Sequence, residues 1–368
     1  MRVLLMTNDL QLAGAERVVI NCARCLRDRG VTCAVVGLFE RTEGPGRLRV
    51  GLQGEGFPVW CAEIERYTDL WRFGRLARVV RRWRPDLLHA FLFHSHVAAA
   101  GLRGFGWAGP TVWTYESIAL RVQPLRHGFY RFCAPLADAH IFASRAVRRY
   151  WYRGRNPTPN PRVIYNGLDL EPFLAVRPDT GPVFGAVGRL VPLHKGFDVL
   201  IRAFARLKEE RPEIRLKIAG DGPARRDLEE LARRLEVAEG VEFVGFVEDV
   251  PAFLSEVNIF VNPSRWEAFG NTLVEGMAAG LPCIASRIQG LAEVGGDLVR
   301  RVRPGDVGSL QKAMREALDH PPPEEQIARQ RRRVTARFGQ EAMTESYLEV
   351  YRSLLGDQAG GRSGGGPV

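Results

Sequence analysis

The chain has 368 residues, of which 45% are hydrophobic and 26% are charged. This length predicts about two domains rather than one core, and no apolar run reaches the roughly 18–20 residues that a membrane-spanning helix needs. The amino terminus lacks the long apolar segment of a secretory signal peptide. We therefore expect a cytoplasmic protein.

The net positive charge of the chain comes from its first half. Residues 1–180 hold 26 Arg against 15 Asp and Glu, whereas residues 181–368 hold 26 Lys and Arg against 27 Asp and Glu. Aromatic residues alternate with the arginines at 71–84 and 145–155. This mixture predicts peripheral contact with an anionic membrane surface. An arginine-rich surface without a binding role is the alternative.

The first half alternates strand and helix patterns, which predicts a parallel, doubly wound α/β sheet. We assign residues 1–168 to a first Rossmann-like domain. Strands are expected at 3–6, 32–37, 58–61, 87–91, 111–114, 139–142 and 163–165, with helices at, for example, 15–29, 67–83 and 94–102.

A second α/β series follows a linker at 167–182, and we assign residues 181–338 to a second Rossmann-like domain. Two such domains are expected to face a central crevice, and the glycine-rich tail at 356–368 is expected to be disordered. Strands are expected at 183–187, 215–219, 241–244, 259–262 and 283–285, and helices at 196–210, 223–235, 271–279, 308–318, 324–338 and 340–355.

Two glutamates eight positions apart, Glu267 and Glu275, flank the start of a predicted helix. Glu267 lies on the loop after the strand at 259–262, where open α/β sheets bind ligands. Glu275 lies about one turn into the helix, whose first N–H groups can bind an anion. A phosphate could bind at the start of this helix, with a carboxylate on either side to accept hydrogen bonds from sugar hydroxyls. This arrangement predicts a nucleotide-sugar site. Two solvated surface glutamates are the alternative.

Cations and glycines occupy the other loops of this domain. Only four of the 52 basic residues are Lys, and Lys195 stands beside a turn glycine. Arg189 and Lys195 can neutralise the charge that grows on a departing diphosphate without a metal ion. Gly188 begins that loop, and Gly220-Asp221 forms a tight turn into a helix, where Asp221 is either a ligand-binding residue or a helix cap.

Candidate residues in the first domain are Gly14, His94 and Glu116. Gly14 begins the helix after the first strand and would bring N–H groups to a pyrophosphate. His94 and Glu116 follow the fourth and fifth strands and fit an acceptor pocket, whereas His89 is expected to pack within its strand. The dinucleotide pattern G-x-G-x-x-G is missing, which argues against a nicotinamide enzyme.

Together, these segments resemble the group 1 family of retaining glycosyltransferases, which have the GT-B fold. The likeness spans roughly residues 1 to 355. It rests on Glu267-x(7)-Glu275, Gly188-Arg189-Leu190, Lys195-Gly196, the segment 219–223 and the segment 165–169.

The resemblance implies a role for most of these residues. Arg189 and Lys195 would bind the donor diphosphate, Glu275 the ribose and Glu267 a hydroxyl of the transferred sugar. It also implies that no metal ion or other cofactor is needed, and that the helix at 340–355 crosses back onto the first domain. The other residues expected to bind substrate are Gly14, Gly188, Gly220, Asp221, Phe269, Gly270, Asn271, Thr272 and His94.

The chain departs from the family pattern at two positions. Ala13 stands where a second glycine is common, and Glu116 stands where many relatives carry a histidine near the donor sugar. We therefore count Glu116, with Arg189, Lys195 and Glu267, among the candidate catalytic residues.

The sequence thus predicts a metal-independent, retaining hexosyltransferase. Its donor would be a UDP- or GDP-sugar, and its acceptor a lipid-linked glycan or a surface polysaccharide. A GT-B-fold nucleotide-sugar epimerase or hydrolase is one alternative. A basic non-catalytic nucleic-acid-binding protein is another, but no recognisable module supports it, so no nucleic acid partner is expected.

Overall fold

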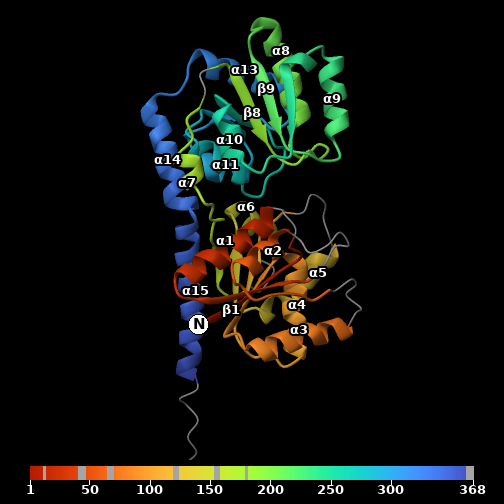
Figure 1. Cartoon of the computed structure of the whole chain (residues 1–368), viewed down its shortest axis with the longest axis vertical. Coiled ribbons are helices and arrows are strands. Elements are labelled where there is room, and N and C mark those ends of the chain that lie inside the picture. Colours follow the sequence, from red (N-terminus) through yellow and green to blue (C-terminus); the bar gives the residue numbers. More distant parts are fainter. Residues whose placement is uncertain are drawn as a thin grey trace, which may run out of the picture. The chain divides into compact units, whose positions relative to one another are not determined.

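The computed structural model describes residues 1–10, 14–39, 47–63, 70–118, 124–152, 158–178 and 181–361. The chain divides into two compact units (Figure 1). Unit 1 comprises Met1–Leu168 with Gln340–Val368, and unit 2 comprises Asp169–Gly339. Among the described residues, no helix combines the length and the apolar character that crossing a membrane requires.

Unit 1 contains a seven-stranded parallel sheet in the order β3-β2-β1-β4-β5-β6-β7. Its central strands are buried along their length because helices cover both faces, as continuous apolar runs predict. The strands are β1 (Arg2–Thr7), β2 (Thr32–Gly37), β3 (Val59–Cys61), β4 (Leu87–Phe91), β5 (Thr111–Tyr115), β6 (Ala139–Phe142) and β7 (Pro161–Val163). The α-helices are α1 (Gly14–Asp28), α2 (Arg47–Gly54), α3 (Leu70–Trp83), α4 (Leu92–Gly104), α5 (Pro124–Cys133) and α6 (Arg145–Trp151).

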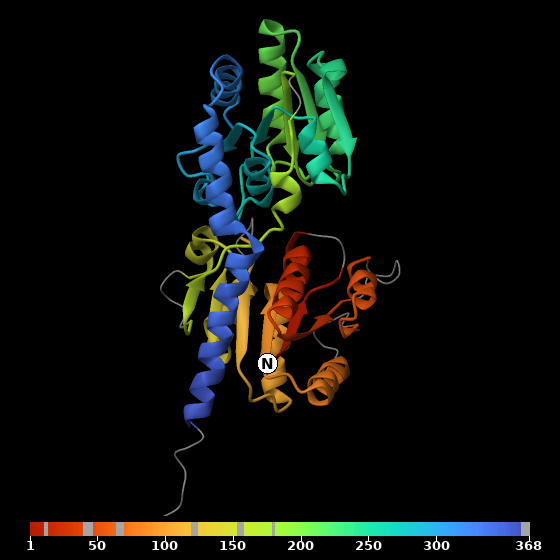
Figure 2. The same ribbon diagram turned by 60° about the vertical axis from the view of Figure 1, so that its left-hand side comes forward.

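The last helix, α15 (Gln340–Gly361), packs on unit 1 beside α1 (Figure 2). Tyr347 and Tyr351 on α15 are fully buried in the core of this unit. His89 on β4 links them to the sheet: its Nδ1 lies 2.5 Å from the Tyr351 hydroxyl and its Nε2 lies 2.6 Å from Thr114 Oγ1. His89 therefore packs within the strand, as the sequence predicted.

Unit 2 contains a six-stranded parallel sheet in the order β10-β9-β8-β11-β12-β13. Phe184, Phe204 and Leu216 lie in its core, between the sheet and the helices on one face. The strands are β8 (Val183–Val187), β9 (Arg215–Ala219), β10 (Val241–Gly245), β11 (Ile259–Asn262), β12 (Cys283–Ser286) and β13 (Arg300–Val302). The α-helices are α7 (Glu171–Leu174), α8 (Phe197–Glu210), α9 (Arg225–Arg234), α10 (Val250–Ser255), α11 (Asn271–Ala278), α12 (Gln289–Gly295), α13 (Val307–Asp319) and α14 (Glu324–Phe338).

The α/β class and the two parallel sheets confirm the sequence prediction, but several boundaries differ. The predicted linker at 167–182 contains α7, which belongs to unit 2. β13 was not predicted, because Arg300 and Arg301 give it no apolar run. The final helix continues to Gly361 rather than ending at 355, and residues 362–368 of the predicted tail lie outside the described residues.

Candidate functional site

Three loops meet at one edge of the sheet in unit 2. Strands β8, β9 and β11 are parallel neighbours, so their carboxyl ends lie at the same edge. The loop at 188–196 follows β8, the turn at 220–223 follows β9, and the loop at 263–270 follows β11. These loops carry most of the residues that the sequence assigned to donor binding.

Backbone hydrogen bonds tie these loops together. The N–H of Gly188 donates to the Ala219 carbonyl at 3.0 Å, and the N–H of Arg265 donates to the His194 carbonyl at 3.0 Å. Gly220 has φ +137°, and a Cβ placed on it would lie 2.0 Å from the Gly188 carbonyl oxygen. Only glycine fits this close approach, so the turn after β9 fixes the start of the loop after β8.

Lys195 and Glu267 form an ion pair at this edge. Lys195 Nζ lies 2.6 Å from Glu267 Oε2, and the two side chains are 19% and 16% exposed. Ser264 extends the polar cluster, because its hydroxyl lies 3.4 Å from Glu267 Oε2 and donates to Asn262 Oδ1 at 2.7 Å. Asn262 in turn donates to the hydroxyl of Thr272 at 3.2 Å. The end of β11, the Lys195–Glu267 pair and the first turn of α11 thus form one polar network.

The amino terminus of α11 opens onto the same network. Gly270 is its N-cap with φ +114°, and no side chain caps the helix there. Asn271 and Thr272 occupy the first turn, and the partly buried Glu275 follows one turn later. The first N–H groups of a helix without a side-chain cap can bind an anion.

Three other predicted residues of unit 2 occupy different surroundings. Arg189 is exposed and forms no ion pair within the described part of the chain. Asp221 accepts from the Gly222 N–H at 2.7 Å and lies 3.7 Å from Arg225, so it stabilises the turn before α9. Phe269 is only 3% exposed, and its ring centroid lies 5.3 Å from that of Phe338 on α14. Its side chain therefore packs in the core.

The candidate residues of unit 1 follow β1, β4 and β5. Gly14 is the first residue of α1, and residues 11–13 of the predicted phosphate loop lie outside the described residues. Glu116 directly follows β5 and is 8% exposed. His94, on α4, packs against the ring of Phe39 at 5.1 Å. Burial, assisted by the charge of Arg126, lowers the pKa of His94 to about 4, so its ring is neutral at pH 7.

Arg265 is a residue of this edge to which the sequence assigned no individual role. Its guanidinium forms a two-pronged ion pair with Asp198 on α8, at 2.6 and 2.7 Å. It also donates to the Leu193 carbonyl at 3.0 Å. Arg265 thereby holds the loop before Glu267 against the loop that carries Lys195. Arg265 and Asp198 are 67 positions apart in the sequence, so no local pattern predicts that they pair.

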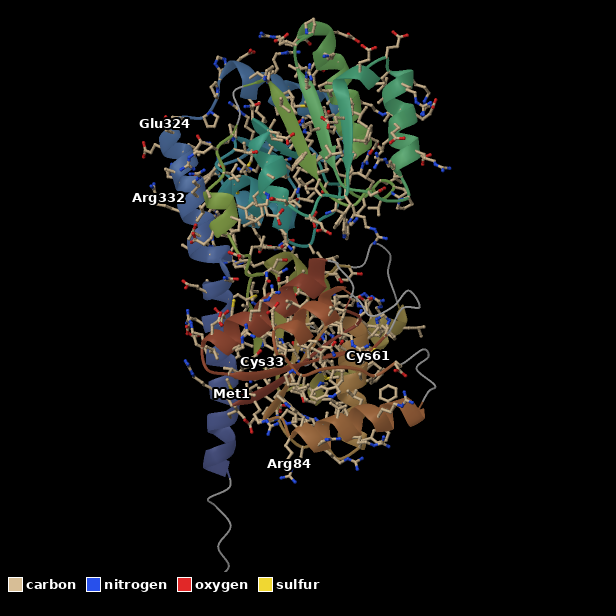
Figure 3. The ribbon with its side chains drawn as sticks, in the orientation of Figure 1. Met1, Cys33, Cys61, Arg84, Glu324 and Arg332 are labelled. Atoms are coloured by element: carbon tan, nitrogen blue, oxygen red, sulfur yellow. The ribbon has the colours of Figure 1, made fainter. Side chains whose placement is uncertain are left out.

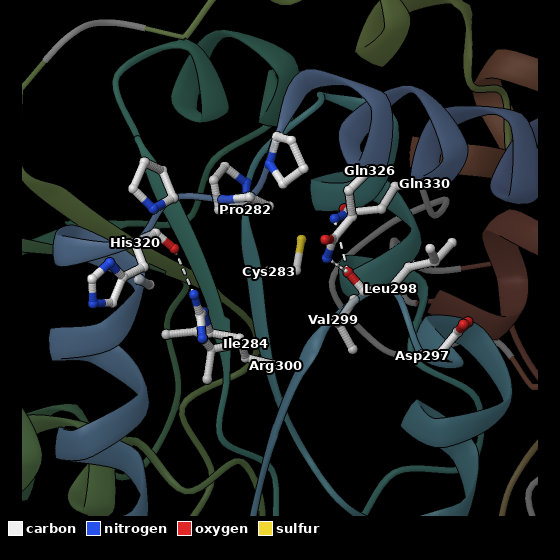
Figure 4. A pocket seen from close by; sticks show the side chains of 14 residues that line it. Pro282, Cys283, Ile284, Asp297, Leu298, Val299, Arg300, His320, Gln326 and Gln330 are labelled. Atoms are coloured by element: carbon white, nitrogen blue, oxygen red, sulfur yellow. Dashed lines mark hydrogen bonds between the residues drawn. The ribbon is translucent and has the colours of Figure 1, made fainter.

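A separate pocket lies at the opposite edge of the sheet, where β12 and β13 begin (Figure 4). Cys283 is at its centre, and Gln326 and Gln330 on α14 donate to the Leu298 carbonyl beside it. Burial raises the pKa of the Cys283 thiol, which donates to the Leu281 carbonyl at 3.2 Å. This thiol is therefore unreactive, and the pocket is remote from the predicted donor residues.

The comparisons with known proteins match both units. The family model described as "Glycosyl transferases group 1" matches residues 171–334, and the one described as "Glycosyltransferase Family 4" matches residues 12–172. The lipopolysaccharide core biosynthesis glycosyltransferase LpsE of Rhizobium meliloti is 33% identical over 92% of this chain and 96% of its own length. A glycogen synthase of Mycobacterium tuberculosis is 30% identical over 74% of this chain and 69% of its own length.

Solved structures share the fold at lower identity. HepE of Anabaena, in complex with UDP, has a TM-score of 0.81 at 21% identity, covering 96% of this chain and all of that chain. A glycosyltransferase of Rickettsia africae has a TM-score of 0.83 at 17% identity, covering 96% of this chain and 98% of its own. These likenesses confirm the predicted GT-B fold.

Proposed function

The chain belongs to the group 1 family of glycosyl transferases, and we propose that it is a metal-independent, retaining hexosyltransferase. Its donor is a UDP- or GDP-sugar, and its acceptor is a lipid-linked glycan or a surface polysaccharide. The observation that carries the proposal is the Lys195–Glu267 pair beside the uncapped amino terminus of α11. A cation, a carboxylate and free N–H groups are what a sugar diphosphate requires.

Lys195, Arg189 and the amino terminus of α11 together bind the donor diphosphate. The leaving diphosphate gains negative charge in the transition state, and fixed positive groups in a partly buried site stabilise it without reorganising. Glu267 holds the Lys195 ammonium at this edge. A bound donor phosphate would compete with Glu267 for the Lys195 ammonium. Glu267 could then accept a hydrogen bond from a hydroxyl of the transferred sugar.

Glu275 is assigned to the ribose hydroxyls, because it lies one turn beyond the phosphate-binding end of α11. A UDP-sugar donor is supported by HepE, a protein of the same fold whose structures include UDP and UDP-glucose complexes. The acceptor hydroxyl attacks on the face that the diphosphate leaves, and an oxygen of the departing phosphate takes its proton. Glu116 and the neutral His94 in unit 1 bind the acceptor by hydrogen bonds.

Surface features of unit 1 support an acceptor at an anionic membrane. Two large apolar side chains of α5 face solvent, Leu125 at 87% exposure and Phe132 at 77%. Arg126 and Arg131 lie on the same short helix. Exposed arginines also end α3, where Arg84 points away from the unit (Figure 3). Apolar side chains among arginines are typical of helices that lie in a membrane interface.

The membrane proposal is tested by flotation with liposomes. We expect the chain to float with vesicles that contain an anionic lipid, and the L125S/F132S variant to float much less. The matched control is V244S/F246S, which removes two exposed apolar side chains of unit 2, 39% and 57% exposed. Equal flotation with neutral and anionic vesicles would contradict the proposal.

The donor proposal is tested by thermal shift with UDP-, GDP- and ADP-sugars. One of these donors should raise the melting temperature of the wild-type chain, and K195A and E275A should each diminish the shift. K312A is the control, because Lys312 is 76% exposed on α13, away from the donor loops. A shift that is unchanged in both K195A and E275A would contradict the site assignment.

A further inference from the structure

Three arginines outside the donor loops line one pocket of unit 2. Arg287 directly follows β12, Arg301 lies in β13, and Arg303 directly follows β13. Val302 and Ser309 complete the lining. All three arginines are exposed, so their guanidinium groups can meet a ligand from solvent.

Hydrogen bonds from the backbone hold the pocket together. The N–H of Arg287 donates to the Val302 carbonyl at 2.7 Å. The N–H of Arg303 donates to the Ser309 hydroxyl at 3.2 Å, which ties the end of β13 to the first turn of α13. The three arginines therefore lie in or directly after two paired strands, and a backbone hydrogen bond to the first turn of α13 anchors Arg303.

The positive charge of this pocket is not balanced by the residues around it. Within the described ranges, none of the three arginines forms an ion pair with a carboxylate. The acidic residue of the adjacent turn, Asp306, accepts from the Ser309 N–H at 2.9 Å and so caps α13. Arg300, by contrast, is paired with Glu316 at 3.3 Å and donates to the His320 carbonyl.

The pocket lies near the donor loop but is separate from it. In the strand order of the sheet, β12 and β13 are the last two strands at one side. The strand β8, whose following loop carries Lys195, is separated from them by β11. The turn after Arg303 reaches the donor loop: a Cβ placed on Gly305 would lie 3.5 Å from Arg265 Nε. A ligand held by the three arginines would thus sit beside the loop that carries Glu267 without occupying the Lys195 site.

We propose that Arg287, Arg301 and Arg303 bind a phosphomonoester group, as a second anion site apart from the donor diphosphate. Guanidinium groups offer pairs of N–H donors that match phosphate oxygens, and they remain charged at any physiological pH. A phosphomonoester carries close to two negative charges and three terminal oxygens, which suits three guanidinium groups. A carboxylate would leave most of their charge unbalanced. The group belongs either to a soluble phosphorylated compound or to a lipid headgroup.

The direct test is calorimetric titration of the full chain with inorganic phosphate at constant ionic strength. All chains carry K195A, so that phosphate binding in the donor site is suppressed. We expect R301Q/R303Q to bind phosphate at least about tenfold more weakly than the parent, since each hydrogen bond to a charged group contributes about 1.5–3 kcal/mol, or roughly tenfold or more. The control R202Q/R206Q removes the same charge from the exposed face of α8 and should bind like the parent.

Two further arms separate the sources of the phosphate group. Weaker binding of glycerol 3-phosphate by R301Q/R303Q, with flotation on phosphatidic acid vesicles unchanged, would identify a soluble phosphomonoester. Loss of flotation with vesicles containing phosphatidic acid would identify a lipid headgroup. Thermal unfolding of R301Q/R303Q must match that of the control variant, which shows that both fold alike. Equal phosphate binding by R301Q/R303Q and its parent, or no binding by the parent, would overturn the proposal.

Discussion

Replacing Lys195 by methionine keeps the length of the side chain and removes its charge. The ammonium lies 2.6 Å from Glu267 Oε2, with less than a fifth of either side chain exposed. Exposed ion pairs contribute about 0.2–1 kcal/mol, whereas removing one partner of a fully buried pair costs about 3–5 kcal/mol. We therefore expect K195M to lower the free energy of unfolding of unit 2 by about 1–3 kcal/mol, because Glu267 loses its counter-charge.

The same substitution should affect catalysis more than stability. Removing one group that stabilises developing negative charge typically lowers kcat by about 10²–10³, and we expect K195M to lower kcat/KM for the donor by about that factor. The E267Q/K195M double variant distinguishes the two effects. It restores most of the stability, because no carboxylate is left without a partner, but it does not restore the activity.

The assay combines urea unfolding with release of nucleoside diphosphate in the presence of acceptor. K312M serves as the control, because Lys312 is 76% exposed and lies away from the donor loops. Activity of K195M within about threefold of wild type would refute the assignment of Lys195 to the leaving diphosphate, since loss of such a group costs about 10² or more. Recovery of activity in the double variant would refute it too.

Three further predictions concern stability, pH and the acceptor. G220A should lower the free energy of unfolding by about 2–4 kcal/mol in urea titrations, because its Cβ would lie 2.0 Å from the Gly188 carbonyl oxygen at φ +137°; a loss below about 0.5 kcal/mol would contradict the backbone geometry. Burial lowers the pKa of His96 to about 3 and that of His140 to about 4, from 6.5, so the unfolded chain binds more protons below pH 6.5. The free energy of unfolding should therefore fall as the pH drops from 6.5 toward 4. Its change per pH unit should be smaller in a His140→Gln variant, and an unchanged pH dependence would contradict the lowered pKa of His140. E116Q should lower kcat by about 10² with little change in KM for the donor, measured by initial rates, because the acceptor hydroxyl would no longer be oriented for attack; an unaltered kcat would remove Glu116 from the catalytic residues.

Much of the fold could be predicted because its strands are continuous apolar runs. β4 and β6 begin and end where the sequence predicted, since buried parallel strands leave little choice of residue. The bounds of α5 were not predicted, because its exposed Leu125 and Phe132 obscure the helical alternation of apolar and polar residues. An amphipathic pattern predicts the face that packs on a core, and these two side chains face solvent instead.

The candidate site was predicted less completely than the fold. Glu267, Glu275 and Lys195 stand out by their spacing and by the scarcity of lysine, but the pairing of Lys195 with Glu267 spans 72 positions. The burial of Phe269 depends on Phe338, which lies on a distant helix. The three arginines of the phosphomonoester site come from β12 and β13, and only the pairing of these strands brings them together. Contacts of this kind are set by tertiary packing, which a local pattern does not reveal.

The most direct test of the central claim is transfer of a labelled sugar. The chain is incubated with a UDP-sugar carrying a radioactive sugar, with and without a glycolipid extract, and both released UDP and labelled product are measured. We predict that UDP release depends on the extract, equals the label transferred to it, and is lost in K195M. UDP release that proceeds equally without an acceptor would contradict glycosyl transfer and identify a nucleotide-sugar hydrolase instead.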